Sequence, residues 1–431
     1  MKLSFMTLSA AILLAATVSN AEEWSYDDCL QYAMEHNISL QQSRLNEELS
    51  EFTLEASKAQ WNPSINFTTT HNLTDQPWAD NKNSFYQSSY GLNAGWTVWN
   101  GGERENTIKR NNLQISIDAH ATDDIIRSLE TELLSIYINI LYAHESISIY
   151  QDAVELSRAQ TDRARQLMDA GRLSRVDYTQ LVAQYEQDRY SLVNAEGDYN
   201  SKRMELKQLL ELGINNDITP KDIEWTSEQV LAELPPIEES YRLAIVTDSQ
   251  LKAKKLENES AELDIKIAKA GYYPELSLNA GIGTNYSSGN AWGKQMKEGF
   301  NESVGITLAV PIMDNKKTKT AVAKARVQQI STQLEYDARL TELAQAVEHW
   351  YIDLSAAQSR YKAGLEQERS ASLSNELVNE QFRLGLVNTI ELMTAHNNLL
   401  EARHSLLQAK YMAMLSHKMI EFYRTATISM P

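Results

Sequence analysis

The two halves of this chain repeat each other with a period of about 213 residues. Pro63 in the first half corresponds to Pro274 in the second, and the turn that begins at Gly171 corresponds to the turn that begins at Gly385. A repeat of this length is a duplicated structural unit, because the modules of solenoid proteins span only about 20–50 residues. The sequence therefore predicts two copies of one long unit.

Each half is dominated by uninterrupted helix. Residues 103–170 contain neither proline nor glycine, and residues 316–384 contain only Gly364. At 1.5 Å per residue, each stretch predicts a helical rod of about 100 Å. Two shorter helices placed end to end match one rod, which predicts antiparallel columns packed side by side as a wall or cylinder. The shorter helices are expected at residues 26–60, 174–212, 237–270 and 388–423.

Strand-like segments interrupt the helices at residues 62–100 and 272–313, with two segments in each range. Each alternates apolar with small polar residues over about 10 to 13 residues, and a tilted membrane strand needs about 9 to 11. The polar positions are Ser, Thr, Asn and Gly with almost no charge, as in the wall of a water-filled lumen. Aromatic residues gather near the segment ends, where membrane barrels carry interfacial girdles: Trp61, Phe85, Tyr86, Trp96, Trp99, Tyr272, Tyr273, Tyr286 and Trp292.

An ordinary antiparallel sheet with one buried face is the alternative interpretation of these segments. If they are membrane strands, an open sheet is excluded, because backbone groups in lipid must be paired. Four strands are too few to close a barrel, for which about eight is the minimum. We therefore predict an α+β membrane protein in which several copies close one barrel.

The chain ends and the composition narrow the class of protein further. Residues 1–21 resemble a secretory signal peptide, with Lys2, an apolar run and a small-x-small cleavage site at Ser19-Asn20-Ala21. The net charge of −18 argues against nucleic acid as a partner. Cys29 lies on an apolar helical face, which predicts a buried and unreactive thiol rather than a lipid attachment site.

The sequence contains no recognisable catalytic or cofactor motif. It lacks His-Glu-x-x-His, a glycine-rich phosphate loop after a strand, and a nucleophile elbow. We therefore expect no enzymatic activity, no cofactor and no metal. Between the halves, residues 214–236 have the composition of a linker, and residues 424–431 form a C-terminal tail.

The duplication, the rod lengths and four local motifs resemble the TolC-like outer-membrane efflux proteins. The motifs are the turn-and-cap segments at residues 171–177 and 385–391 and the strand-closing segments at residues 96–102 and 310–315. The resemblance covers about residues 24 to 423 and implies a homotrimer with a twelve-stranded barrel in outer-membrane lipid. It also implies a periplasmic helical tunnel, with residues 214–236 and the tail forming a belt around it.

The same resemblance implies a function and partners. The chain would be the exit duct of a tripartite efflux or type I secretion system in a Gram-negative cell. It would receive substrates from an inner-membrane pump, of RND or ABC type, through a periplasmic adaptor. The transported substrate is not implied. The net acidity favours cations in the lumen.

The resemblance assigns the adaptor-docking surface to the two helix-turn-helix tips. Gly171 and Gly385 at these tips are also expected to end helices in left-handed backbone, a role that needs no partner protein. The implied docking residues are Gly171, Arg172, Leu173 and Ser174 in the first half and Gly385, Leu386, Val387 and Asn388 in the second.

Glu391 occupies the position at which relatives narrow the entrance with acidic residues. One turn further, where a second acid would lie, this chain has Thr394, so the resemblance implies a single carboxylate ring. Capping of the helix that starts after Asn388 is the alternative role for Glu391.

A soluble periplasmic coiled-coil scaffold without a pore is the competing function. It predicts extraction without detergent and a monomer, whereas the channel predicts a detergent-requiring oligomer.

Overall fold

The computed structural model describes residues 22–78, 84–214, 216–233, 235–288 and 291–430. The expected signal peptide at residues 1–21 lies outside them. The chain divides into two compact units, and each contains segments of both halves of the sequence. We call residues 39–127 and 238–347 the sheet unit, and residues 1–38, 128–237 and 348–431 the tip unit. The compact units therefore do not follow the sequence repeats.

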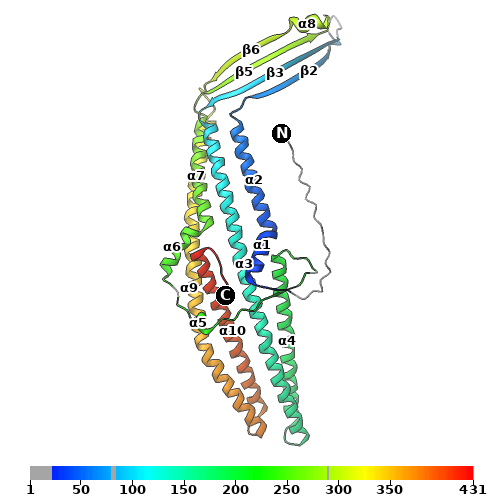
Figure 1. Ribbon diagram of the computed structural model, residues 1–431, viewed down its shortest axis with the longest axis vertical. Helices are drawn as coiled ribbons and strands as arrows, with labels where there is room; N and C mark the ends of the chain where they lie inside the picture. Colours follow the sequence, from blue (N-terminus) through cyan, green and yellow to red (C-terminus); the bar gives the residue numbers. More distant parts are fainter. Residues whose placement is uncertain (1–21, 79–83, 215, 234, 289–290, 431) are drawn as a thin grey trace. The chain divides into compact units, whose positions relative to one another are not determined.

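The sheet unit contains one antiparallel sheet of four strands in the order β2-β3-β5-β6 (Figure 1). The two hairpins expected from the sequence pair through β3 and β5, which leaves β2 and β6 as the edges. The short helix α8 (Trp292–Glu298), which the sequence did not predict, connects β5 to β6. The strands span Ser64–Asp75 (β2), Ser84–Asn100 (β3), Glu275–Ser287 (β5) and Asn301–Ala309 (β6).

Strand β6 ends earlier than the range 272–313 suggested. Pro311 follows Ala309 by two residues and has no backbone N–H to donate to a ladder. Ile312 is therefore left outside the sheet, with 96% of its surface exposed.

The register gives the sheet two different faces. One cross-strand row of the apolar face consists of Ile65, Ala94, Ala280 and Val304. The adjacent row, on the opposite face, consists of Ser64, Gly95, Asn279 and Gly305. Because side chains alternate across a strand, this separation extends along much of the sheet, with Glu302 of β6 as a charged exception in the row of Ile282 on the apolar face.

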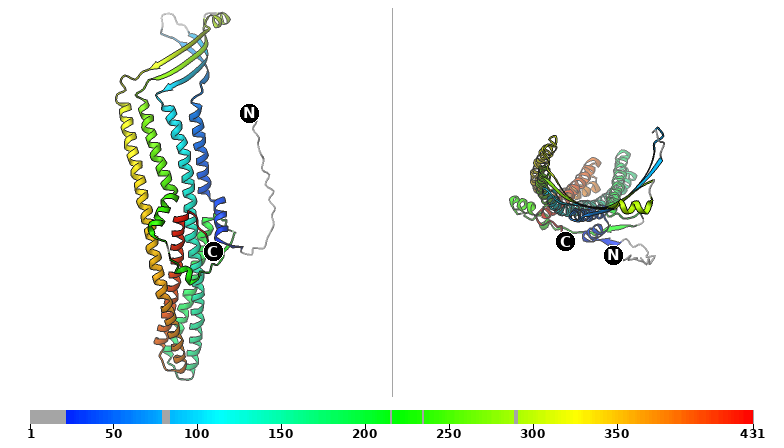
Figure 2. Two further views of the ribbon diagram at one scale, coloured as in Figure 1. Left: turned by 60° about the vertical axis from the view of Figure 1, so that its left-hand side comes forward. Right: turned by 90° about the horizontal axis from the view of Figure 1, so that it is seen from above.

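The helices of the sheet unit lie side by side in one layer, in the order α2, α3, α7 and α9 (Figure 2). The sheet unit contains only the first parts of the two long helices, α3 and α9. These helices, with α6, span Ile38–Ala59 (α2), Glu103–Asp169 (α3), Ile237–Thr247 (α6), Ser249–Ala270 (α7) and Lys317–Leu384 (α9). Side-chain hydrogen bonds join neighbours in the layer: Ser43 to Thr122, Arg110 to Asp264 and Lys254 to Glu335.

The two helices expected at residues 26–60 and 237–270 are each broken once, so this prediction was wrong in the same way in both halves. Asn37 separates α1 (Tyr26–His36) from α2, and Asp248 separates α6 from α7. Both residues have extended backbone, with ψ of 123° and 117°. Asp248 then accepts a hydrogen bond from the N–H of Leu251 (2.7 Å), which caps α7. Asn and Asp favour such side-chain caps over a continuous helix.

The tip unit is built from two helical hairpins and a short parallel strand pair. The rest of α3 pairs with α4, and the rest of α9 with α10 (Figure 1). Strands β1 and β4 form a two-stranded parallel sheet that the sequence did not predict. The remaining elements span Glu22–Trp24 (β1), Arg175–Leu209 (α4), Ile218–Pro220 (β4), Ser227–Val230 (α5) and Thr389–Thr425 (α10).

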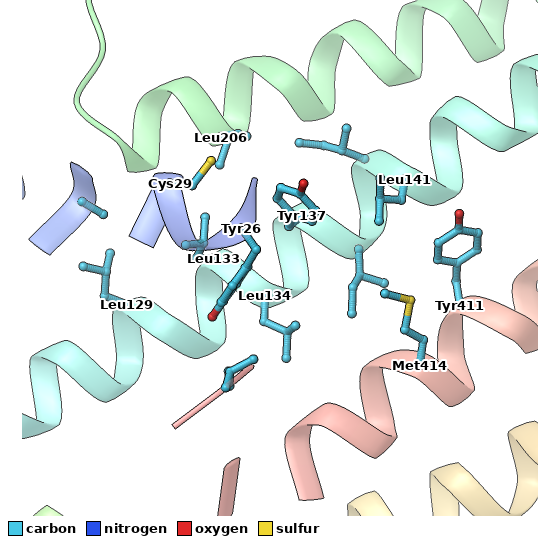
Figure 3. Close-up of a cluster of buried hydrophobic side chains, with 14 of the residues drawn as sticks. Tyr26, Cys29, Leu129, Leu133, Leu134, Tyr137, Leu141, Leu206, Tyr411 and Met414 are labelled. Atoms are coloured by element: carbon cyan, nitrogen blue, oxygen red, sulfur yellow. The ribbon is translucent and has the colours of Figure 1, made fainter. Parts of the chain in front are cut away.

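The largest hydrophobic cluster of the tip unit joins α1, α3, α4 and α10 (Figure 3). Leu133 and Tyr137 of α3 are fully buried between Cys29 of α1 and Met414 of α10. Cys29 is buried, as predicted, and burial raises the pKa of its thiol to about 12, which disfavours the reactive thiolate.

Residues 221–233 and Pro235 form a strap across the helices of the tip unit, and two tyrosines from equivalent positions of the repeat hold its ends. The hydroxyl of Tyr137 donates to the carbonyl of Lys221 (2.7 Å), and that of Tyr351 donates to the carbonyl of Pro235 (2.7 Å). The C-terminal tail also packs on this unit, where Ile428 is 6% exposed. The expected linker and tail are therefore both folded against the helices.

Candidate functional site

The first helical tip ends α3 in a left-handed turn. Gly171 has φ of 72°, its N–H bonds the carbonyl of Met168 (2.9 Å), and the N–H of Arg172 bonds that of Leu167 (2.8 Å). These two bonds form a Schellman motif. The next helix, α4, starts at a side-chain cap, in which Ser174 Oγ accepts from the N–H of Asp177 (3.1 Å).

The second tip repeats this geometry with different side chains. Gly385 has φ of 76°, and the N–H of Leu386 bonds the carbonyl of Gln381 (2.9 Å). Asn388 caps α10 by accepting from the N–H of Glu391 (2.9 Å), and its amide donates to Glu391 Oε1 (2.9 Å). The glycines therefore do end helices, as expected from the sequence.

The two tips pack against each other around a small hydrophobic cluster. Leu167 and Leu181 of the first hairpin meet Phe382 and Leu392 of the second, all at most 9% exposed. Among the eight residues expected at the docking surface, two are half-buried against this cluster: Leu173 and Val387. The other six are exposed: Gly171, Arg172, Ser174, Gly385, Leu386 and Asn388. The structure thus brings both predicted tips to one end of the tip unit.

A polar link that sequence reasoning missed joins the first turns of α4 and α10. Thr389, only 1% exposed, points its hydroxyl at Asp177 Oδ1 (2.9 Å) and Gln180 Oε1 (3.2 Å). Hydrogen bonds from Ser174, and then from Thr389, hold the pKa of Asp177 below its usual range. Because Thr389 and Asp177 are far apart in sequence, local patterns gave no signal for this contact.

Four exposed apolar side chains surround the turns: Val176, Leu384, Leu386 and Ile390, at 66%, 67%, 71% and 66% exposure. Of these four residues, only Leu386 belonged to the predicted docking surface. The signal for the others was present, because an aliphatic residue beside a capping turn and outside the helical stripe has no intrachain neighbour to cover it. Exposed aliphatic residues around a rigid turn are typical of protein-docking surfaces.

Between α3 and α9, above the tips, lies a cavity of about 770 Å³ with α10 on one side. Gln160 of α3 bonds Asn379 of α9 across it (2.8 Å). Charges of both signs line it, including Glu155, Glu376 and Arg403. The cavity is thus a groove along the two long helices, lined both by charged side chains and by apolar ones such as Leu156 and Leu399.

The suggested entrance residue, Glu391, is exposed and engaged in the cap of α10. One turn on, the hydroxyl of Thr394 bonds the carbonyl of Ile390 (2.8 Å). The capping role of Glu391 is therefore present, and its entrance role stays a prediction.

Within the described ranges, no helix is long and apolar enough to cross a membrane. The same residues contain no group of three or more His, Cys, Asp or Glu side chains that could hold a metal ion.

Known proteins resemble this chain over most of its length. The family model of the outer membrane efflux proteins matches residues 29–211 and 240–416, one match in each half. The Outer membrane efflux protein BepC of Brucella suis is 20% identical over 94% of this chain and 86% of its own length. The Outer membrane protein TolC of Escherichia coli is 23% identical over 64% of this chain and 57% of its own length.

Solved structures share the fold at low identity. The outer membrane protein VceC of Vibrio cholerae superposes with a TM-score of 0.80 at 12% identity, over 93% of this chain and 95% of that one. A CusC structure gives a TM-score of 0.81 at 15% identity, over 94% and 92%. The chain therefore belongs to the outer membrane efflux protein family, and is an outer-membrane channel protein of efflux or secretion that extends into the periplasm.

Proposed function

We propose that three copies of this chain close a twelve-stranded outer-membrane barrel and a periplasmic helical tunnel. This channel is the exit duct of a tripartite system and carries out no chemistry itself. The observation that carries the proposal is the sheet of four strands with two unpaired edges.

Both edge strands, β2 and β6, are exposed almost throughout. An open edge cannot lie in lipid, because each unpaired N–H and C=O costs several kcal/mol there, roughly 2–7. Strand direction alternates across β2-β3-β5-β6, so β6 of one copy and β2 of the next run antiparallel. Three copies then give an even-numbered barrel within the known size range. The apolar face would contact lipid and the Ser, Thr, Asn and Gly face would line the lumen.

The edge helices of the sheet unit support the same closure. On α2, Leu45, Leu49 and Phe52 form an exposed stripe, each between 57% and 64% exposed. On α9, the exposed stripe is Val327, Ile330 and Leu334, between 57% and 68%. Both recur at helical spacing, and an uncovered apolar stripe favours a partner helix.

Charge and position make the two stripes complementary. Glu48 and Glu55 flank the α2 stripe, whereas Lys324 and Arg326 lie beside the start of the α9 stripe. The α2 stripe ends about two turns before the end of α2 that leads into β2, and the α9 stripe begins about three turns after the start of α9 that follows β6. The α2 face of one copy therefore fits the α9 face of the next, a head-to-tail contact that closes into a ring.

The tips supply the docking surface for the periplasmic adaptor. Their exposed aliphatic residues and the groove between α3 and α9, with its charged and apolar lining, suit a helical partner that carries matching apolar and charged positions. The pump would be an inner-membrane transporter of RND or ABC type. Among the relatives, an Alkaline protease secretion protein, AprF of Pseudomonas aeruginosa, is 23% identical over 70% of this chain. A polypeptide is therefore one substrate class for this duct, and small molecules are another.

A cysteine pair across the proposed interface tests the assembly. Phe52→Cys with Val327→Cys should form a disulfide between chains, giving covalently linked trimers on a denaturing gel. Native Cys29 is buried and does not interfere.

The matched control pairs Phe52→Cys with Ile352→Cys, an exposed position (61%) further along α9. It should remain unlinked. Equal linking in both pairs would contradict the proposed α2–α9 contact, and a monomer that needs no detergent would instead favour the soluble scaffold.

A further inference from the structure

Helix α10, the most extensively buried helix of the tip unit, carries three inward-facing histidines that the channel function does not use. They differ in whether the ring has an acidic partner. His396 Nε2 lies 3.0 Å from Asp188 Oδ2 of α4, and both side chains are 2% exposed. Asp188 also accepts from Gln184 (2.8 Å). This histidine therefore has a buried carboxylate beside it.

His404 faces a polar cavity of about 200 Å³ between α3, α4 and α10. Its ring lies 4.4 Å from the ring of Tyr150, and its Nε2 is buried without a hydrogen-bond partner among the described residues. The titratable groups that line the same cavity are Asp198 of α4 and Tyr142 and Tyr150 of α3. Burial lowers the pKa of His404.

His417 lies near the other end of α10, beneath the strap. Its ring meets that of Trp225 edge-on at 6.2 Å, and its Nδ1 is buried without a partner in the described part of the chain. Burial, with Lys418 beside it, lowers the pKa of His417, while Glu421 acts weakly in the opposite direction. Lys418 is itself held by Glu421 (2.8 Å) and by the carbonyl of Ser429.

We propose that His404 and His417 make the packing of α10 acid-sensitive, so that proton uptake by both rings loosens α10 from α3, α4 and the strap. The His396–Asp188 pair keeps the part of α10 next to the tip attached. The packing of α10 thus responds to the proton as its ligand. Since α10 begins at the second tip, its packing sets how firmly that tip is held.

The direction of the pH dependence follows from the lowered pKa values. A histidine in a loosened α10 takes up a proton near pH 6.5, whereas the packed ring resists it. The packed state therefore has its full stability above about pH 6.5 and loses stability as the pH falls below that value. The loss stops once the packed rings are also protonated.

Hydrogen exchange in the full-length protein tests this proposal without reference to transport. Protection factors for α10 peptides, corrected for intrinsic exchange, are compared at pH 7.5 and 5.5. We expect protection in the wild type to fall by up to about tenfold for each histidine at pH 5.5, or about a hundredfold for both. His404→Gln with His417→Gln should abolish most of this fall, because amides do not titrate.

His349→Gln is the matched control, since this histidine of the same unit is 65% exposed and pairs with Asp353. It should leave the wild-type response unchanged. Should the double variant fold poorly, His404→Phe and His417→Phe tested singly should each remove about half of the response on a logarithmic scale. A wild type with equal protection at both pH values, or variants with the wild-type response, would overturn the proposal. Neither result would bear on the channel itself.

Discussion

The tip unit and the sheet unit differ in where their largest groups of apolar side chains lie. All three hydrophobic clusters found among the described residues lie in the tip unit, around residues such as Leu133, Leu354 and Phe382. The sheet unit instead leaves large apolar residues exposed on its sheet face and on both edge helices, for example Phe67 and Phe52. In the proposed assembly, the tip unit can be stable within one chain, whereas the exposed apolar surface of the sheet unit would be covered by lipid and further copies.

The largest expected effect comes from comparing the truncation of a buried side chain in the tip unit with that of an exposed side chain in the sheet unit. Leu133→Ala removes a fully buried side chain and should cost the tip unit about 2–5 kcal/mol, seen as faster hydrogen exchange in α3 and α10. Leu49→Ala, at 63% exposure, should leave that exchange unchanged and lower the temperature at which the complex dissociates. If both variants changed hydrogen exchange in the tip unit equally, the difference drawn between the two units would be wrong.

A charge on either face of the sheet should reveal which face meets lipid. Ile306→Arg, on the apolar face, should cost about 2–4 kcal/mol near the membrane midplane and deplete the protein from the outer-membrane fraction. Thr307→Arg, its neighbour on the polar face, should assemble normally and change channel conductance. If Thr307→Arg were the more harmful, the faces would be assigned the wrong way round.

A substitution in the turn of the first tip can strain the backbone without a steric clash. A Cβ at Gly171 would meet no atom within 4 Å beyond its chain neighbours, so the φ of 72° is the main obstacle to a side chain there. Gly171→Val should therefore cost about 1–2 kcal/mol locally and impair export and adaptor binding while oligomers still form. Gly171→Asn should be tolerated, because Asn accepts left-handed backbone. The same pair at Gly385 should behave alike. Lost assembly in the Val variants would indicate a folding role alone.

The smallest effect concerns the link between the tips. Thr389→Val keeps the side-chain shape but removes the hydroxyl that reaches Asp177 and Gln180, which should cost about 1 kcal/mol and increase exchange in the first turns of α4 and α10. Thr394→Val is the control, since its exposed hydroxyl bonds only the backbone of its own helix. Indistinguishable exchange in the two variants would show that the link is not stabilising.

Local chemistry made much of the fold predictable from the sequence. The turns at Gly171 and Gly385, the caps at Ser174 and Asn388, and the long helices α3 and α9 depend on neighbouring residues, and the structure contains each of them. The alternation of apolar and polar residues likewise indicated the strands and their two faces.

Contacts between distant segments were not predictable in this way. The helix breaks are one example, because Asn37 and Asp248 can also continue a helix, and Asp248 is held in its break by Arg339 (2.7 Å) from α9. The link from Thr389 to Asp177 is another. Each depends on which helices become neighbours. Helical periodicity indicates which face of a helix is buried, but it does not indicate which element covers that face.

The number of chains in the purified complex tests the central claim most directly. Native mass spectrometry of the detergent-solubilised, full-length protein should give a complex of three chains, with no stable monomer until the detergent or temperature disrupts it. A detergent-independent monomer, or a complex whose chain number is not three, would contradict the twelve-stranded channel.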